Sequence, residues 1–267
     1  MRRAAAGRVP AGAGTAGGVP VGAAVGGVVL AGVAAVVVVT ARRVAALRAA
    51  GRTVAPLDHA TRVPGTDPAC RLVVCGDSAA AGHGLPSADD GLARQLGRRI
   101  VARTGRAVAV TSVARDGATT AEVTATQVPQ LDAEVEVVLV GVGVNDAVRG
   151  RAPADVEEAT AALLRAVGAA SPTAEVVLLS CPDLGSAPGL PRVLRPLLGR
   201  SCRRVAAAQH RAAARVGVTV VPAGGDLPAS AFGPDGFHPG PAGIRLLVDR
   251  IEARTVGRLG IAPDAHR

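Results

Sequence analysis

Five short apolar runs, separated by stretches with helical periodicity, do most to limit what this chain can fold into. The apolar runs, each suited to a buried strand, cover residues 71–75, 108–113, 135–141, 175–180 and 217–222. The helical stretches cover residues 88–104, 119–131, 153–169, 194–216 and 241–259. This alternation predicts right-handed crossovers and a parallel sheet covered by helices on both faces. In such sheets, ligands bind beyond the carboxyl ends of the strands.

The amino-acid composition excludes some kinds of site and limits the residues that can form the core. The chain has 267 residues, of which 49% are hydrophobic, which is enough for one substantial α/β domain and an appendage. All thirty basic residues are arginines, and the absence of lysine excludes a Walker-type phosphate lysine and Schiff-base catalysis. With no Trp, no Tyr and only two Phe, the core must consist of Val, Leu, Ala and a few Ile.

The net charge of +9 is concentrated at the N-terminal end. Residues 1–65 carry +7, whereas residues 66–267 carry only +2. Because no aromatic residue near the basic segment can stack on bases, we do not expect nucleic-acid binding.

The cysteines do not indicate a metal site. They are Cys70, Cys75, Cys181 and Cys202. None forms a Cys-x-x-Cys pair, and no histidine lies at metal-ligand spacing from them. Buried free thiols are expected, while one disulfide stays open if the domain is exported.

The first 48 residues predict a membrane anchor. No charged residue occurs in residues 9–41, and their denser apolar part, residues 19–40, matches the roughly 20 residues that span a bilayer. The run is long for a signal peptide; a buried helix or a disordered Gly/Ala-rich leader is the alternative. We expect a single-pass protein of the cell membrane, and nearly equal numbers of flanking arginines leave its orientation undecided. Residues 49–69, rich in Pro, Gly, Thr and Asp, predict a linker.

Residues suited to catalysis follow several of the predicted strands. Ser78 follows the first strand, Gly117 the second and Asn145 the third, while Asp235 and His238 lie three residues apart before the last helix. These loops are expected to converge at one edge of the sheet, because the carboxyl ends of parallel strands lie together.

This set of groups is complete for acyl transfer. A serine nucleophile needs a base, and the base needs a partner that fixes its tautomer. Ser78 can be the nucleophile, His238 the base and Asp235 the partner. The backbone N–H groups of Ser78 and Gly117 and the side-chain amide of Asn145 are candidates for the oxyanion hole.

The same blocks resemble those of the SGNH (GDSL-type) hydrolase superfamily of esterases and lipases. Its namesake Ser, Gly, Asn and His fall on Ser78 in GDSAAAG, Gly117 in DGATT, Asn145 in GVGVND and His238 in DGFHP. The resemblance implies a three-layer α/β/α sandwich of flavodoxin-like type over residues 70–262, with Asp235 as the third member of the triad. It also implies a carboxylic ester hydrolase that needs no metal or organic cofactor and takes a small ester or lipid-like substrate. Ala79 replaces the Leu of the GDSL name, a change that removes no catalytic group.

Residues near the blocks have plainer interpretations. We expect Asp77 to cap or brace its loop, and His83 to lie in the pocket wall or on the exposed side of the first helical turn, rather than to catalyse. Phe232 and Phe237 either anchor the His238 loop or line an acyl pocket. The Pro- and Leu-rich residues 181–200 form either an ordinary connection or a lid.

Two other functions are compatible with parts of the sequence. The Gly141-x-Gly143 pair opens a nucleotide-binding fingerprint, but Asp146 occupies the position where the third glycine is required. The other rival is a membrane-tethered binding module with an inactive or repurposed hydrolase fold. The sequence does not distinguish a short-chain acyl ester, a lysophospholipid, a thioester and an acetylated sugar as substrates, nor does it indicate an oligomeric state.

Overall fold

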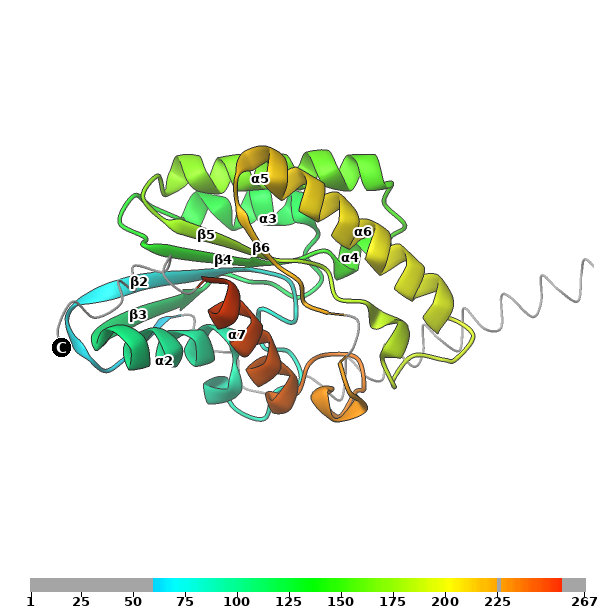
Figure 1. Ribbon diagram of the computed structural model, residues 1–267, viewed down its shortest axis with the longest axis horizontal. Coiled ribbons are helices and arrows are strands. Elements are labelled where there is room, and N and C mark those ends of the chain that lie inside the picture. Colours follow the sequence, from blue (N-terminus) through cyan, green and yellow to red (C-terminus); the bar gives the residue numbers. More distant parts are fainter. Residues whose placement is uncertain (1–59, 225–226, 256–267) are drawn as a thin grey trace, which may run out of the picture. The chain divides into compact units, whose positions relative to one another are not determined.

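The described part of the chain is built on one six-stranded sheet. The computed structural model describes residues 60–224 and 227–255. The strands lie in the order β1-β3-β2-β4-β5-β6 (Figure 1). They are β1 (Ala60–Val63), β2 (Thr66–Gly76), β3 (Arg106–Ser112), β4 (Val137–Gly141), β5 (Glu175–Leu179) and β6 (Thr219–Val221). All neighbours pair in parallel except β1, which runs antiparallel to β3 at the edge of the sheet.

Helices cover both faces of this sheet. They are α2 (Leu92–Thr104), α3 (Thr120–Thr126), α4 (Val144–Val148), α5 (Pro153–Ala170), α6 (Arg195–Val216) and α7 (Pro241–Thr255). Short 3-10 turns are η1 (Ala88–Asp90), η2 (Val128–Gln130), η3 (Leu184–Ser186) and η4 (Ala229–Ala231). Helices α2 and α7 lie on one face, and α3, α5 and α6 lie on the other (Figure 1). Within the described residues the predicted α/β/α layering is therefore observed.

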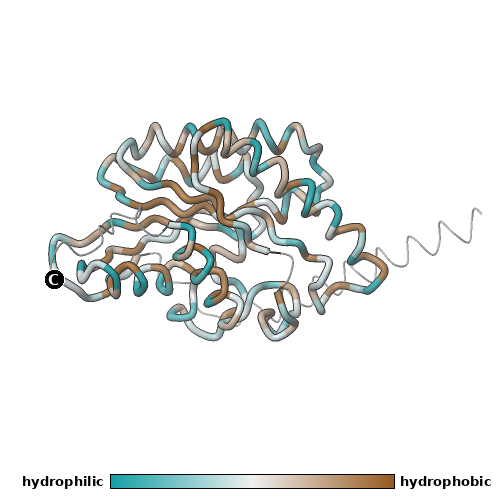
Figure 2. The backbone as a smooth tube through the Cα atoms, viewed as in Figure 1, coloured by the Kyte–Doolittle hydropathy of each residue, from teal (hydrophilic) through white to brown (hydrophobic). Residues whose placement is uncertain are grey.

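The two faces of the sheet bury separate cores because side chains alternate along each strand. On β2, Leu72 and Val74 join the core under α2 and α7, whereas Val73 and Cys75 join the core under α3 and α5. The central strands are almost continuously apolar (Figure 2), as expected for strands buried on both faces.

The strand order places a topological switch point between β2 and β4. The chain leaves β2 for β3 on one side and then crosses to β4 on the other side of β2. Ligands of doubly wound sheets bind in the crevice at the carboxyl ends of the two strands that flank such a point. The turn that carries Ser78 and the short helix α4 that carries Asn145 follow these two strands.

Two sequence predictions need correction. The linker predicted over residues 49–69 is wrong from residue 60 onward, because β1 and the start of β2 occupy residues 60–63 and 66–69. The sheet is also not wholly parallel, because β1 is antiparallel. A half-exposed edge strand has no apolar run, and Pro68 is tolerated near the start of β2, so residues 60–69 carry a loop-like composition.

The predicted anchor over residues 19–40 lies outside the described residues, as does the rest of residues 1–59. No helix among the described residues is long and apolar enough to cross a membrane. The four cysteines are all buried and free.

Candidate active site

Ser78 lies in a tight turn directly after β2. The turn begins at Gly76, whose φ is +149°. A Cβ there would lie 2.0 Å from the carbonyl oxygen of Gly141, so only glycine lets the ends of β2 and β4 approach this closely. The Asp77 N–H donates to that same oxygen of Gly141 at 3.0 Å, and the Arg115 N–H donates to Gly76 O at 3.1 Å. These bonds hold the loops after β2, β3 and β4 together at one edge of the sheet.

In the structure, the His238 ring lies between Ser78 and Asp235, within hydrogen-bonding distance of both. The Nε2 of His238 lies 2.9 Å from Ser78 Oγ, and its Nδ1 lies 2.5 Å from Asp235 Oδ2. Because a carboxylate only accepts, the Nδ1 contact selects the tautomer with its proton on Nδ1. Nε2 then carries the lone pair that faces the serine hydroxyl.

Asp235 is fixed by the short turn that the sequence predicts. Its Oδ1 accepts the backbone N–H groups of Phe237 and His238, both at 2.9 Å. Burial acts to raise the pKa of Asp235, but the hydrogen bonds from the His238 ring and from these two backbone groups outweigh it and hold the pKa below its usual value. The carboxylate is therefore charged at neutral pH.

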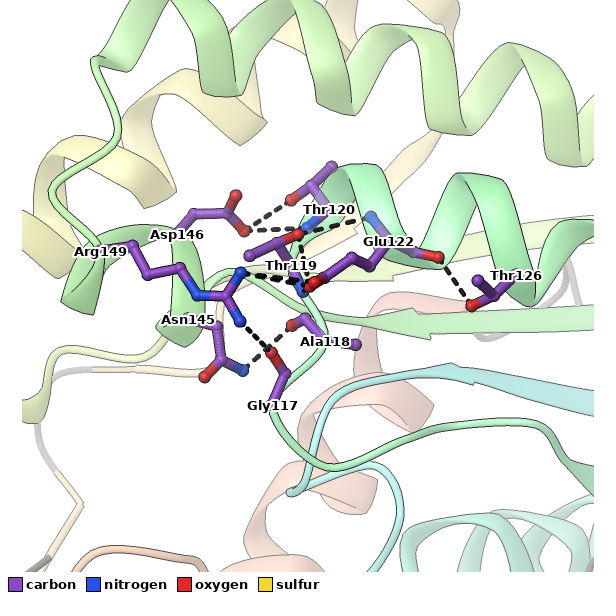
Figure 3. A network of polar contacts seen from close by, with 9 residues as sticks. All are labelled: Gly117, Ala118, Thr119, Thr120, Glu122, Thr126, Asn145, Asp146 and Arg149. Carbon is purple, nitrogen blue, oxygen red and sulfur yellow. Dashed lines mark hydrogen bonds and ion pairs between the residues drawn. The ribbon is translucent and has the colours of Figure 1, made fainter.

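Gly117, in the loop after β3, and Asn145, in the first turn of α4, are the other predicted oxyanion donors, and they lie next to each other (Figure 3). Gly117 has a φ of +78°, which an L side chain would strain. Asn145 Nδ2 donates to Ala118 O at 3.0 Å, so one amide hydrogen orients the side chain and the second is left for another acceptor. Arg149 donates to Gly117 O at 3.1 Å and thereby ties α4 to the Gly117 loop.

Two buried aspartates support these loops. Asp146 accepts from the backbone N–H and the hydroxyl of Thr120 and so joins α4 to α3 (Figure 3). Asp77 accepts the Ala79 N–H at 3.1 Å within the Ser78 turn. Burial raises the pKa of Asp77 to about 7, although the bond from Ala79 opposes this shift.

Two buried glutamines that the sequence did not single out lock the strand ends. Gln127 accepts the Gly76 N–H at 2.7 Å and donates to Gly76 O at 2.9 Å. Gln209 accepts the Cys181 N–H at 2.7 Å and donates to Val142 O at 2.8 Å. The signal available in the sequence was weak, since each glutamine simply occupies an otherwise apolar position of a helical stretch.

His83 lies directly beside Ser78 and His238. Its backbone N–H donates to Ser78 O at 2.9 Å, and its ring centroid lies 4.5 Å from that of His238. Its Nδ1 lies 2.7 Å from Oδ2 of Asp116. Sequence reasoning missed this pairing because Asp116 lies in a different loop, 33 residues along the chain.

The remaining nearby residues pack the site in place. The Phe237 ring meets the His238 ring edge-on at 5.1 Å, and both Phe232 and Phe237 pack on a core beneath α6. The Gly189 N–H donates to Gly236 O at 2.7 Å, so the connection between β5 and α6 is attached to the turn that carries Asp235 and His238.

Comparison with known proteins identifies this architecture. Residues 74–246 match the model of the GDSL-like Lipase/Acylhydrolase family. The chain belongs to this family. It is also 32% identical over 196 residues to the GDSL-like esterase Rv1075c of Mycobacterium tuberculosis. That alignment covers 67% of this chain but only 60% of the relative's length.

Solved structures share the fold at lower identity. The extracellular lipase of Streptomyces rimosus is 20% identical with a TM-score of 0.52, and covers 70% of this chain and 100% of its own. The lipase/acylhydrolase of Enterococcus faecalis is 23% identical with a TM-score of 0.56, and covers 73% of this chain and 100% of its own. The family match and the 32% identical relative confirm the SGNH/GDSL resemblance drawn from four short blocks.

Proposed function

We propose that this family member is a serine esterase that cleaves carboxylic esters through an acyl-enzyme. The observation that carries the proposal is the unbroken relay from Asp235 through His238 to Ser78, with heavy-atom separations of 2.5 and 2.9 Å. A general base must lie within hydrogen-bond reach of the proton that it removes, and His238 does.

In the first half of the proposed reaction, Ser78 Oγ attacks the ester carbonyl carbon while its proton passes to His238 Nε2. Asp235 stabilises the imidazolium, which donates to it through Nδ1. The tetrahedral intermediate collapses, its bond to the alcohol oxygen breaks, and the alcohol leaves with the proton from Nε2. The acyl group is then esterified to Ser78.

In the second half, water attacks the acyl-enzyme. His238 Nε2 removes a proton from the water, the bond between the acyl carbon and Ser78 Oγ breaks, and the proton returns to Ser78. The N–H groups of Ser78 and Gly117 and the second amide hydrogen of Asn145 are proposed to bind the oxyanion. Each such donor is worth about 2.7–4 kcal/mol in comparable enzymes.

The proposed substrate is a small ester or a lipid-like ester. Family membership and the names of the relatives support an ester of this kind. The apolar residues 19–40 add a proposed single-pass anchor, which would favour membrane or envelope substrates by proximity. None of the proposed steps uses a metal or an organic cofactor.

The test is hydrolysis of p-nitrophenyl esters, from acetate to palmitate, by the full chain and by Ser78→Ala and His238→Ala. We expect each substitution to lower kcat at least about 10³-fold. The matched control is Ser87→Ala, which alters an exposed serine that caps η1. Activity that survives Ser78→Ala would contradict the mechanism. A folded but inert parent chain that binds an ester without turnover would instead support the binding-module alternative.

A further inference from the structure

The hydrogen bonds of His83 leave one ring nitrogen able to bind a metal ion. Asp116 Oδ2 accepts from its Nδ1, so the lone pair lies on Nε2. Only 8% of the His83 side chain is exposed, and its Nε2 is buried with no hydrogen-bond partner among the described residues. A buried nitrogen acceptor without a partner is costly, and a metal-ligating histidine is usually held by a carboxylate on its other nitrogen.

Two further groups that could bind a metal lie beside His83. Each of His83, His238 and Asp235 offers one ligand atom, and the three atoms lie within 4.8 Å of one another. The N–H of His83 is bonded to Ser78 O, and a Cβ on Gly84 would lie 3.9 Å from Asp235 Oδ2. The His83 segment therefore lies against the triad and is bonded to the backbone of Ser78.

The chemistry of the three groups selects a borderline-soft divalent cation. Two imidazole nitrogens and one carboxylate oxygen form a common zinc ligand set, with bonds of about 2.0–2.2 Å and a fourth position left for water. Ligand atoms around such a tetrahedral ion lie about 3.4 Å apart, so shifts of about 1 Å would close the site. Mg²⁺ and Ca²⁺ prefer oxygen ligands and suit the set poorly.

We propose that His83, His238 and Asp235 form an inhibitory Zn²⁺ site built into the active site. The metal takes the place between His238 and Asp235 that the Nδ1 proton occupies. His238 stays neutral by carrying its proton on Nε2, so this nitrogen can no longer accept the proton of Ser78. Chelators that remove the metal restore the original tautomer and the activity.

The site is tested first without catalysis, by isothermal titration of ZnCl₂ into the full chain carrying Ser78→Ala. We expect one zinc per chain in the micromolar range. His83→Gln in the same background is expected to weaken binding at least tenfold, and Asp116→Asn several-fold through the lost orientation of the ring. The matched control His210→Gln, at an exposed position of α6, should leave the affinity unchanged. No zinc binding, or binding that His83→Gln leaves intact, would overturn the proposal.

The second arm measures inhibition of ester hydrolysis and so rests on the proposed function. Zinc should inhibit the full chain at the concentrations at which it binds, EDTA should reverse this, and Mg²⁺ should have no effect. Zinc binding in a chain with no esterase activity would support the site and contradict the proposed function. Esterase activity that zinc leaves unchanged would contradict the inhibitory site alone.

Discussion

His238 is the residue on which the proposed chemistry depends, because its two ring nitrogens have different partners. Asp235 holds the proton on Nδ1, and Ser78 therefore meets a nitrogen that can accept. Asp235 is itself held by two backbone N–H groups of the same turn, so the orientation of the base is set locally, within four residues.

Replacement of the Asp235 carboxylate tests this orientation. Asp235→Asn keeps the size of the side chain, but its amide can donate to Nδ1 and so favours the wrong tautomer. We expect kcat to fall about 10⁴-fold, as in other triads. The matched control is Asp249→Asn, at an exposed ion pair with Arg99, which should keep full activity. A fall of less than tenfold for Asp235→Asn would contradict the assigned role.

The raised pKa of Asp77 predicts that the stability of the fold depends on pH. Its pKa in the folded chain, about 7, lies above the ordinary value of 3.8. The folded state therefore binds the extra proton between these two pH values, and the stability from this group is full below about pH 4 and lost as the pH rises through 7.

Asp77→Asn should remove this dependence while its side-chain oxygen still accepts the Ala79 N–H. Urea unfolding at pH 5 and pH 8 measures the effect. The free energy of unfolding of the variant minus that of the parent should increase from pH 5 to pH 8, on the order of a few kcal/mol. Equal differences at both pH values would show that Asp77 titrates normally.

At the scale of the element, the ends of β2, β4 and β5 are locked by side chains instead of further strand pairing. Gln127 satisfies both backbone groups of Gly76, two residues before Ser78. Gln209 performs the same task between Val142 and Cys181. The turn that carries Ser78 is therefore supported by α3 through Gln127, the residue that caps the end of this helix.

Gln127→Leu would leave the buried N–H of Gly76 without this partner, whereas Gly76 O would keep the N–H of Arg115. We expect a loss of about 1–3 kcal/mol in the free energy of unfolding, the cost of one orphaned buried group. Thermal or urea unfolding measures it, with the exposed Gln130→Leu as matched control. Similar stabilities for the two variants would contradict the support role.

The sequence predicted the five parallel strands well and the antiparallel edge strand β1 poorly. The five apolar runs each contain or overlap one of the parallel strands, because strands buried on both faces need continuous apolar residues. The edge strand β1 was missed since half of its residues are exposed. The pairs His83–Asp116 and Gln127–Gly76 could not be predicted, because they join loops and elements far apart in the chain.

At the scale of the whole molecule, the chain divides its charge unevenly. Residues 1–65 carry +7 of the net +9, and the uncharged residues 9–41 lie within them. The hydrolase fold occupies the described residues beyond. This uneven charge favours two separate roles. The basic, apolar N-terminal segment is proposed to determine where the protein is located, and the nearly neutral domain is proposed to bind the substrate.

The proposed anchor predicts that the full chain partitions into the membrane fraction of the expressing cells and stays there after an alkaline carbonate wash. Detergent should release it. Replacement of Val28 and Val29 by aspartate, at the centre of the apolar run, should shift it to the supernatant, because each charge at the centre of a span costs about 2.5–3.5 kcal/mol. A parent chain that is washed off by carbonate would contradict the anchor.

The central claim, that Ser78 is a nucleophile activated by His238, is tested most directly by covalent labelling. The full chain is treated with a fluorophosphonate probe and digested, and the modified peptide is identified by mass spectrometry. The account predicts one label, on Ser78, with labelling strongly slowed in His238→Ala and absent in Ser78→Ala. A label on another residue, or equal labelling of the parent and His238→Ala, would contradict it.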